Sequence, residues 1–302
     1  MQGEVFIGLD IGGGSTKIGA VTAAGRIVAR DRLPVIAGES FDQIIAAYVA
    51  TIDTLLSGAK PGGIGIGFPG HILPDLTIGV NGNVPALDGK PIAETLARHF
   101  GCKARLVNDA DAGAVAEYRF GAGQSVRRLM LITVGTGIGV SLVVNGAPFN
   151  AANGTLGDAG HVVVVAEHPV RCRQGCLGCL ESVASGAALE TKALALFPKS
   201  AEGTATAALV RAAIAGQSDA NALISEAGRW IGMAAATWCN IFAPDRILIG
   251  GGISAVGAPL VATIRDEAHH RAMPYNIRDT DFALAGLGND AGIIGAAAVI
   301  ML

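Results

Sequence analysis

The chain of 302 residues is long enough for two domains or for one domain with a large core. Hydrophobic residues make up 51% of it, charged residues only 16%, and glycine occurs 43 times. This composition is typical of a tightly packed α/β protein and excludes a disordered or coiled-coil chain. A formal net charge of −3 leaves no basic surplus, so we expect no nucleic-acid partner.

A mean hydropathy of +0.48 raises the question of a membrane protein. Residues 129–157 and 247–264 contain no charged side chain. Glycine and polar residues interrupt both segments, whereas a spanning helix needs about 20 apolar residues in a row, so we expect no membrane partner. The first residues show no signal-peptide core, which predicts a cytoplasmic protein. Five cysteines, three of them clustered beside a histidine, fit a reducing compartment and a metal better than disulfides.

The first part of the chain reads as strands alternating with amphipathic helices. Strands are expected at residues 5–9, 18–21, 27–33, 64–68 and 105–107. Helices are expected at residues 41–56, 91–100 and 109–120. Ser40 with Gln43 predicts a capping box before the first helix, and Pro91 predicts the start of the second.

The pattern then restarts. Strands are expected at residues 129–133, 140–144, 162–165 and 246–249, and helices at residues 181–197, 219–242 and 291–302. A strand, a glycine turn and a second strand therefore occur twice, near residues 5–21 and 129–144. Two similar halves with backbone amides at a strand turn suggest a cleft that holds one polyanion from both sides.

The first glycine turn, residues 10–17, reads Asp-Ile-Gly-Gly-Gly-Ser-Thr-Lys. Glycines let backbone N–H groups approach phosphate oxygens, and Ser15 and Thr16 add hydroxyl donors. Asp10 could hold Mg²⁺ directly or through water, and Lys17 either adds charge or is simply solvated. The loop is not a Walker motif, because Gly-Lys-Ser/Thr is missing. An ordinary glycine hairpin is the alternative.

Residues 65–70, Gly-Ile-Gly-Phe-Pro-Gly, fit the dinucleotide pattern Gly-x-Gly-x-x-Gly. Here the glycines lie mostly inside a strand, and residues 71–76 do not open a helix. We therefore reject NAD binding.

The pair Asn108-Asp109 follows a strand and opens a helix. A carboxylate there points out of the end of the sheet, and the helix dipole helps to keep it ionised. Phosphoryl transfer to an alcohol needs such a group to accept the hydroxyl proton. From the residues alone a helix-capping acid is equally good. Asp111 is expected to lie at the surface.

A short segment gathers one imidazole, three thiols and two carboxylates. It reads Gly-Asp-Ala-Gly-His at residues 157–161 and Cys-Arg-Gln-Gly-Cys-Leu-Gly-Cys-Leu-Glu at residues 172–181. One histidine and three cysteines can fill a tetrahedral zinc shell. A buried histidine beside incidental cysteines is the alternative.

This segment resembles the central motif of the ROK family of repressors, open reading frames and sugar kinases, Gly-Glu-x-Gly-His followed by Cys-x-Cys-Gly-x-x-Gly-Cys-x-Glu. The turns at residues 65–70, 135–139 and 250–254, the Asn-Asp pair and residues 287–292 resemble further motifs of the family. The resemblance implies an α/β fold of two actin-like (ribonuclease-H-like) domains with the active site in the cleft between them. We place the N-terminal domain at residues 1–115, closed by a helix at 289–302, and the C-terminal domain, with the zinc loop inserted, at residues 116–288.

The resemblance implies an ATP-dependent sugar kinase with Asp109 as the general base. Implied sugar ligands are Gly70, Asn83, Asn108, Asp109, Asp158, His161 and Glu181. Implied ATP and phosphate ligands are Asp10, Gly12, Gly13, Gly14, Ser15, Thr16, Lys17, Gly135, Thr136, Gly137, Gly250, Gly251 and Gly252. The implied cofactors are Mg-ATP, with Asp10 towards magnesium, and a structural zinc on His161, Cys172, Cys176 and Cys179. A sugar and ATP are the expected partners, and because family members are often dimers, a homodimer is implied as well.

The sequence departs from the family at three places. Asp158 stands where the family has glutamate, so its carboxylate is shorter by one methylene. Gln174 stands at the middle cysteine, so Cys176 would replace that ligand. The first loop has two extra residues compared with Asp-x-Gly-Gly-Thr-Lys, and resembles the first phosphate motif of exopolyphosphatases, which share the actin-like fold. Glucose, fructose, an N-acetylhexosamine and a cyclitol-type analogue all remain open as substrates.

Four alternatives follow from these features. The first loop leaves polyphosphate open as an alternative donor, and it also suggests a phosphatase, which would need water near Asp109. A protein that binds sugar without catalysis is a third, against which the retained Asp109 speaks. A sugar-sensing repressor would carry an N-terminal helix-turn-helix, for which a first strand at residue 5 leaves no room.

Overall fold

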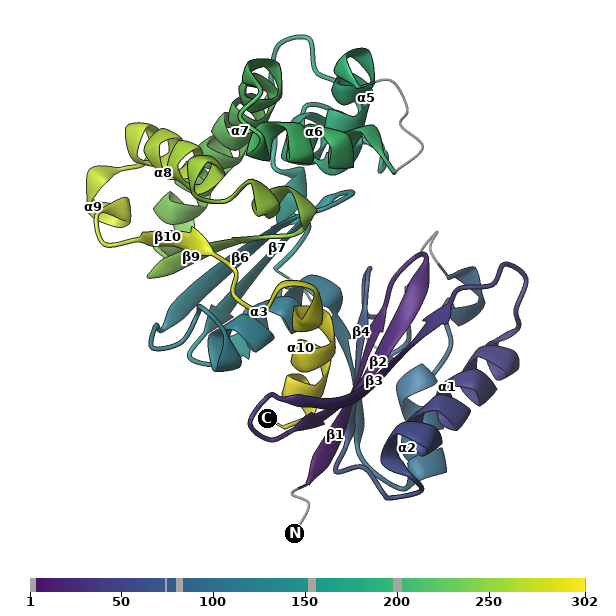
Figure 1. Ribbon diagram of the computed structural model, residues 1–302. Helices are drawn as coiled ribbons and strands as arrows, with labels where there is room; N and C mark the ends of the chain where they lie inside the picture. Colours follow the sequence, from purple (N-terminus) through teal and green to yellow (C-terminus); the bar gives the residue numbers. More distant parts are fainter. Residues whose placement is uncertain (1–3, 74, 80–83, 152–155, 198–202, 302) are drawn as a thin grey trace. The chain divides into compact units, whose positions relative to one another are not determined.

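The computed structural model describes the chain except residues 1–3, 74, 80–83, 152–155, 198–202 and 302 (Figure 1). None of the helices in this described part is both long enough and apolar enough to cross a membrane.

Two compact units divide the chain. Unit 1 comprises residues 1–124, 146–157 and 287–302, and unit 2 comprises residues 125–145 and 158–286. The domain boundaries expected from the sequence, at residues 115 and 289, stay a prediction.

Unit 1 contains a five-stranded sheet in the order β3-β2-β1-β4-β5 (Figure 1). Its strands are β1 (Val5–Ile11), β2 (Ser15–Thr22), β3 (Ile27–Pro34), β4 (Ile64–Phe68) and β5 (Ala104–Asn108). β1 pairs antiparallel with β2 and parallel with β4, and β4 pairs parallel with β5. The carboxyl ends of β1, β4 and β5 therefore share one edge, and the glycine turn, Gly70 and Asp109 directly follow these ends.

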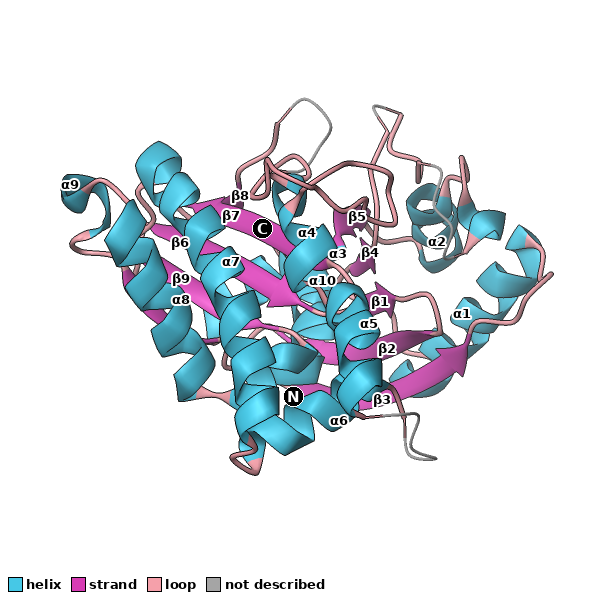
Figure 2. Ribbon diagram, turned by 90° about the horizontal axis from the view of Figure 1, so that it is seen from above, coloured by secondary structure: helices cyan, strands magenta, loops and turns pink. Residues whose placement is uncertain are grey.

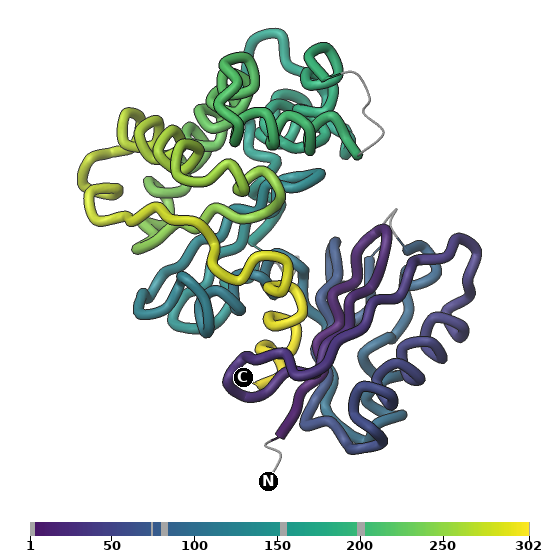
Figure 3. Tube along the Cα trace, viewed as in Figure 1, coloured from purple at the N-terminus to yellow at the C-terminus, as the bar shows by residue number. Residues whose placement is uncertain are grey.

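Helices cover both faces of this sheet. One apolar cluster joins the strands to α1 (Phe41–Leu56) and α2 (Ile92–Phe100). On the other face α10 (Ala291–Ile300) packs against β1 and beside α3 (Asp109–Phe120), and the chain trace shows it next to the N-terminal strands (Figure 3). The capping box at Ser40 and Gln43 is confirmed, with both reciprocal hydrogen bonds present.

Glycines allow α10 to approach the sheet very closely. A Cβ at Gly8 would lie 2.0 Å from the Ile293 carbonyl oxygen, and a Cβ at Gly65 would lie 1.7 Å from that of Ala296. Any larger residue at these two positions would push the helix off the strands.

The second sheet has the order β10-β9-β6-β7-β8. Its strands are β6 (Arg128–Val134), β7 (Ile138–Val144), β8 (Ala147–Pro148), β9 (Arg246–Gly250) and β10 (Asp281–Leu284). β6 pairs antiparallel with β7 and parallel with β9, which pairs parallel with β10. The first strand is central with its hairpin partner on one side, as in the first sheet, so the predicted repeat of strand, turn and strand is confirmed.

Helices also cover the second sheet, and Figure 2 shows α7 and α8 lying over its strands. The helices of this unit are α4 (Leu180–Ala184), α5 (Gly186–Leu196), α6 (Ala205–Ile214), α7 (Ser218–Phe242), α8 (Ala258–Arg271) and α9 (Pro274–Ile277). Short 3-10 helices occur at Pro85–Leu87, Ala159–His161, Gly252–Val256 and Gly288–Asp290.

Two expected elements are wrong. Residues 162–165 do not join a sheet, because the N–H groups of Val164 and Val165 both donate to the Gly178 carbonyl and so hold the segment against the cysteine loop. The single helix expected at residues 181–197 is broken at Ser185, whose hydroxyl instead accepts the Ala188 N–H at the start of α5.

Candidate active site

The glycine turn after β1 is an open loop between two paired strands. The Gly12 N–H donates to the Ser15 carbonyl at 3.0 Å and closes the hairpin, while Gly13 and Gly14 at its tip are exposed. The Ser15 hydroxyl accepts a hydrogen bond from Arg32 Nε at 2.8 Å. The accessible backbone at the tip is the kind of surface on which phosphate oxygens bind.

Thr16 does not lie at the surface of this loop. Its side chain is buried, and its Oγ1 lies 2.7 Å from the hydroxyl of Tyr48 on α1. Burial raises the pKa of Tyr48, so the phenol is neutral. Alternate residues of a strand point to opposite faces, and Thr16 points to the face that α1 covers. Its hydroxyl therefore anchors the loop to α1 and is not the phosphate donor that we expected.

Lys17 is paired and not simply solvated. Its Nζ lies 3.0 Å from Asp10 Oδ2 and also donates to the Asn289 carbonyl at 3.3 Å. The first turn of α10 lies directly against the same carboxylate, because a Cβ at Gly292 would be 2.5 Å from Asp10 Oδ2. Asp10 places one carboxylate beside the phosphate loop. Proteins commonly hold Mg²⁺ with one or two carboxylates together with the substrate phosphates, so the position of Asp10 fits a magnesium ligand.

Asn108 organises the junction between β5 and α3. Its Oδ1 accepts the N–H groups of Ala110 at 2.9 Å and Asp111 at 3.3 Å, so it caps the helix. Its Nδ2 donates to the Gly70 carbonyl at 3.1 Å. An amide nitrogen has two hydrogens, so one remains with which Asn108 can meet a sugar.

Asp109 follows directly, at the first position of α3. Its surroundings remove enough water to raise the pKa of the carboxyl, and the Asp10 charge adds to the rise, although part of the side chain is exposed. The Ala110 N–H donates to Oδ1 at 2.9 Å and opposes this shift. A carboxylate with a raised pKa is a better proton acceptor than an ordinary aspartate.

The expectation that Asp111 lies at the surface is wrong. Its side chain is 3% exposed, because α3 is enclosed by α10 and the sheet over most of its circumference.

In unit 2 the turn between β6 and β7 is built around Glu181. Glu181 Oε2 accepts the Ile138 N–H at 3.1 Å, and a Cβ at Gly137 would lie 2.4 Å from the same oxygen. The start of α5 holds the turn from behind, since the Gly186 N–H donates to the Gly135 carbonyl at 2.7 Å. An expected sugar ligand and an expected phosphate turn are thus in direct contact.

The three glycines after β9 differ in their surroundings. Gly251 has φ +84°, and a Cβ there would lie 2.5 Å from the Val134 carbonyl oxygen, so this residue packs against the end of β6. A Cβ at Gly252 would meet nothing within 4 Å. Gly251 and Gly252 are both exposed, whereas Gly250 is buried at the end of β9, so the backbone open to a ligand is that of Gly251 and Gly252.

His161, Cys172, Cys176 and Cys179 come together as predicted. His161 Nδ1 lies 3.2 Å from Cys176 Sγ, the Cys172 and Cys176 sulfurs are 3.1 Å apart, and all four ligand atoms lie within 4.8 Å of one another. Zn–S bonds of about 2.3 Å and Zn–N bonds of about 2.0–2.1 Å place the ligand atoms of a tetrahedral shell about 3.5–3.8 Å apart. The cluster fits a structural zinc, with Cys176 as its fourth ligand.

The Cys172 thiol is prepared for this role. Burial alone would raise its pKa, but hydrogen bonds from the Cys176 thiol and from the N–H groups of Gln174 and Cys176 lower it to about 7. A metal binds the thiolate form of cysteine. Because the pKa of Cys172 is lowered, little free energy is needed to remove its proton when a metal binds.

His161 faces the zinc cluster with one nitrogen and Glu181 with the other. While Nδ1 points to the thiols, Nε2 lies 3.9 Å from Glu181 Oε2. Gly160 seats the segment on β7, because a Cβ there would lie 2.0 Å from the Ile138 carbonyl oxygen. Asp158, directly before the 3-10 helix Ala159–His161, is exposed. Asn83 lies outside the described residues.

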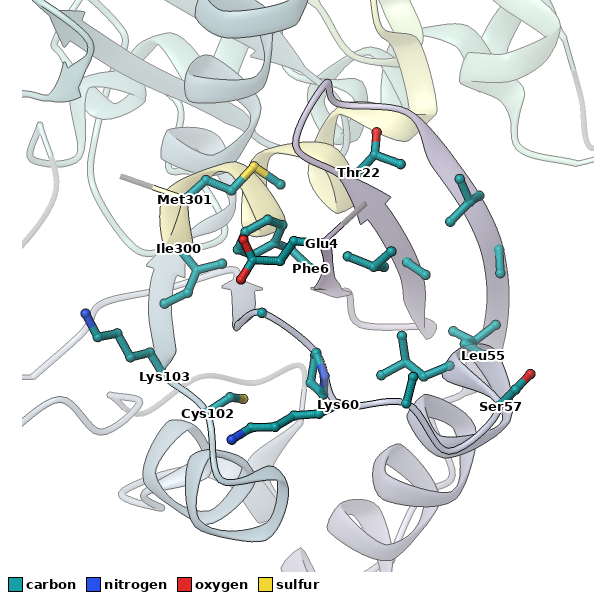
Figure 4. Close-up of a pocket in the computed structure, with 18 of the residues that line it drawn as sticks. Glu4, Phe6, Thr22, Leu55, Ser57, Lys60, Cys102, Lys103, Ile300 and Met301 are labelled. Atoms are coloured by element: carbon teal, nitrogen blue, oxygen red, sulfur yellow. The ribbon is translucent and has the colours of Figure 1, made fainter. Parts of the chain in front are cut away.

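A cavity of about 1440 Å³ in unit 1 lies away from all of these groups (Figure 4). Glu4 and Phe6 line it at the start of β1, whereas Asp10 ends that strand. Lys60, before β4, and Cys102, before β5, also line it, and burial raises the pKa of the Cys102 thiol. No residue of the candidate site lines this cavity.

Comparison with known proteins gives a consistent result. The ROK family model matches residues 6–301. The chain is 32% identical to the glucokinase of Halalkalibacterium halodurans, covering 98% of this chain and 94% of that protein. The xylose repressor of Caldicellulosiruptor bescii is 24% identical, over 98% of this chain and 78% of the repressor.

A solved structure agrees in fold. The ROK family glucokinase of Streptomyces griseus, in complex with glucose and AMPPNP, superimposes with a TM-score of 0.81 at 28% identity, over 98% of both chains. The expected class, α/β with two actin-like (ribonuclease-H-like) domains, is confirmed by this likeness and by the two sheets of equal strand order. The family model spans nearly the whole sequence, and the protein therefore belongs to the ROK family.

Proposed function

We propose that this protein is a sugar kinase, a phosphotransferase that uses Mg-ATP to phosphorylate a hydroxyl of a hexose or hexose-like sugar. The observation that carries the proposal is Asp109, a carboxyl with a raised pKa at the junction of β5 and α3, within the electrostatic reach of Asp10. The likeness to a glucokinase bound to glucose and AMPPNP supports this assignment.

Asp109 accepts the proton of the attacking hydroxyl. Phosphoryl transfer asks for little covalent chemistry from the protein, so orienting the hydroxyl and removing its proton are the main tasks on the acceptor side. Asn108 and the Gly70 turn lie beside the base, joined by the 3.1 Å hydrogen bond, and orient the sugar.

The glycine turn, Ser15 and Lys17 hold the phosphates of the donor. Asp10 would hold the magnesium ion, which offsets phosphate charge when bound. In the protein alone Lys17 neutralises Asp10, and donor phosphates would compete for its ammonium group. Residues 135–137 and Gly252 supply further backbone contacts to the nucleotide.

Asp158, His161 and Glu181 bind sugar hydroxyls. The zinc-binding cysteines fix His161, and Glu181 is held by the Ile138 N–H. Asp158 reaches less far than a glutamate, so the sugar that fits best carries a group that fills this space or is bound there through water. The size of the substituent near Asp158 is thus the feature that selects the substrate.

The test is ADP release from Mg-ATP across a panel of hexoses, N-acetylhexosamines and cyclitols, with Asp109→Asn measured in parallel. We expect one sugar to stimulate turnover and the variant to lose it. ADP release that needs no sugar and survives in Asp109→Asn would contradict the mechanism. Turnover with polyphosphate but not with ATP would assign the other donor and leave Asp109 as the base.

A further inference from the structure

Glu117 is a buried carboxylate that the proposed chemistry does not use. It lies about two turns after Asp109 on α3 and is 0% exposed. Its Oε2 accepts the Ala122 N–H at 2.9 Å, and its Oε1 accepts the Leu287 N–H at 2.7 Å. A carboxyl group this deep is retained only with such hydrogen bonds, because burying a polar group without them is costly.

The end of α3 is shaped around this side chain. The Gly121 and Gly123 N–H groups donate to the Glu117 carbonyl at 3.0 and 2.9 Å. A Cβ at Gly121 would lie 2.1 Å from Glu117 Oε2, so only glycine leaves room for the carboxylate. The turn after α3 therefore packs closely around the Glu117 side chain.

Leu287 begins a short segment that ends beneath the phosphate loop. Two residues later the Asn289 carbonyl accepts Lys17 Nζ, and Gly292 lies directly against the Asp10 carboxylate. Asp290, between them, pairs with Arg30 on β3 at 2.9 Å. Residues 287–292 thus run from the Glu117 carboxylate at one end to the Lys17–Asp10 pair at the other.

We propose that Glu117 is a positioning residue for the phosphoryl donor: by holding Leu287 it fixes residues 287–292, against which Lys17 and Asp10 are set. The same helix carries Asp109 at its first position, so α3 ties the base and the donor-binding pair to one rigid element. This inference rests on the proposed kinase activity.

The two amides that Glu117 holds also flank connections between the units. Ala122 lies just before the passage from unit 1 to unit 2 at residues 124 and 125, and Leu287 is the first residue after the return at residues 286 and 287. The Glu117 carboxylate therefore holds one backbone N–H close to each of two connections between the units.

Glu117→Gln tests the proposal, because the amide has one acceptor oxygen where the site presents two N–H donors. We expect the donor KM to rise and kcat to fall, with roughly a tenfold or larger loss in kcat/KM for the donor, as for loss of a hydrogen bond to a charged group. The KM of the sugar should stay unchanged. Glu117→Asp, which keeps both carboxyl oxygens on a shorter side chain, should recover part of the loss.

Glu190 offers a matched control in unit 2. Its carboxylate likewise accepts two backbone N–H groups, those of Ala205 at 2.9 Å and Thr206 at 2.6 Å, at the start of α6. Glu190→Gln should lower thermal stability and leave the donor KM unchanged. A general loss of stability would affect both variants in the same way.

Amide hydrogen exchange gives a readout that does not depend on turnover. Residues 287–292 should exchange faster in Glu117→Gln than in the wild type or in Glu190→Gln. Wild-type exchange there in folded Glu117→Gln, or equal losses for donor and sugar, would overturn the proposal. If no sugar supports turnover in the wild type, the kinase assignment fails, while the exchange experiment still decides whether Glu117 holds this segment.

Discussion

The Tyr48 hydroxyl and Thr16 Oγ1 lie 2.7 Å apart and join α1 to the phosphate loop through the core. Tyr48→Phe removes one partner and leaves the buried Thr16 hydroxyl without it. We expect unfolding free energy to fall by about 1–3 kcal/mol, the cost of an unsatisfied buried polar group. The donor KM should rise, because the loop loses its anchor. Denaturant unfolding and initial-rate kinetics measure the two effects.

Thr16→Val in the Tyr48→Phe background provides the control. With both polar partners removed, much of the lost stability should return, since an apolar pair of similar shape needs no hydrogen bond. Additive losses in the double variant would show that the two hydroxyls do not interact.

Asp109 should impose a characteristic pH dependence on activity. The base must be ionised, and because its pKa is raised, kcat/KM should fall on acidification at a higher pH than for an ordinary aspartate. A profile that is flat down to the usual aspartate range would rule out this carboxyl as the base. The pH dependence of kcat/KM for the sugar is the measurement.

The same shift predicts the sign of a stability change. A carboxyl whose pKa is raised by folding stabilises the native state while it is protonated, and this stabilisation is lost as pH rises through the folded-state pKa. Asp109→Asn should therefore raise Tm at neutral pH while abolishing turnover. A lower Tm in the variant would show that the ionised carboxylate makes a favourable contact in the folded protein.

Gly137 and Gly135 form a matched pair for the contact with Glu181. A Cβ at Gly137 would lie 2.4 Å from Glu181 Oε2 and displace that flexible side chain, whereas a Cβ at Gly135 would meet nothing within 4 Å. Gly137→Ala should raise the sugar KM by roughly tenfold or more, as for a lost hydrogen bond to a charged group. Gly135→Ala should leave the sugar KM near the wild-type value. Equal sugar KM values for both variants would remove Glu181 from the sugar site.

Metal analysis should find about one zinc per chain, since the cluster supplies one tetrahedral shell. Cys176→Ser should weaken zinc binding by more than the roughly 10–100-fold that loss of an outer-shell partner costs, and should lower Tm. Cys102→Ser is the control, because this thiol lines the cavity in unit 1 and is not part of the zinc cluster. Full zinc content in Cys176→Ser would mean that another group completes the shell.

Local sequence patterns predicted much of this fold because helix caps and tight turns depend on residues that are neighbours in the chain. The capping residues at Ser40 and Gln43, the glycine turns and the Asn-Asp pair are read from neighbours in the chain. The cysteine cluster was also predictable, because all four ligands fall within 19 positions, from His161 to Cys179.

Contacts between distant segments were not predictable in the same way. Nothing in the spacing marks Tyr48 as the partner of Thr16, or Leu287 as the partner of Glu117, since each contact depends on how elements far apart in the chain pack. Asp111 illustrates the same point: a polar residue in a first helical turn suggests solvent, but α10 covers this helix. The prediction of a strand at residues 162–165 was wrong because the same apolar sequence pattern is found in segments that pair with a loop and in strands that join a sheet.

The close packing of α10 against β1 and β4 has a consequence for the synthesis of the chain. Phe6 and Val21 on the first strands bury their side chains against Ile293 and Ala297, which the ribosome makes almost 300 residues after the start. Domains usually fold as they emerge, the N-terminal one first. Here unit 1 begins first yet finishes last, and the strands of its sheet must wait with one apolar face open while unit 2 is translated. A nascent chain at this stage therefore exposes that apolar face to water.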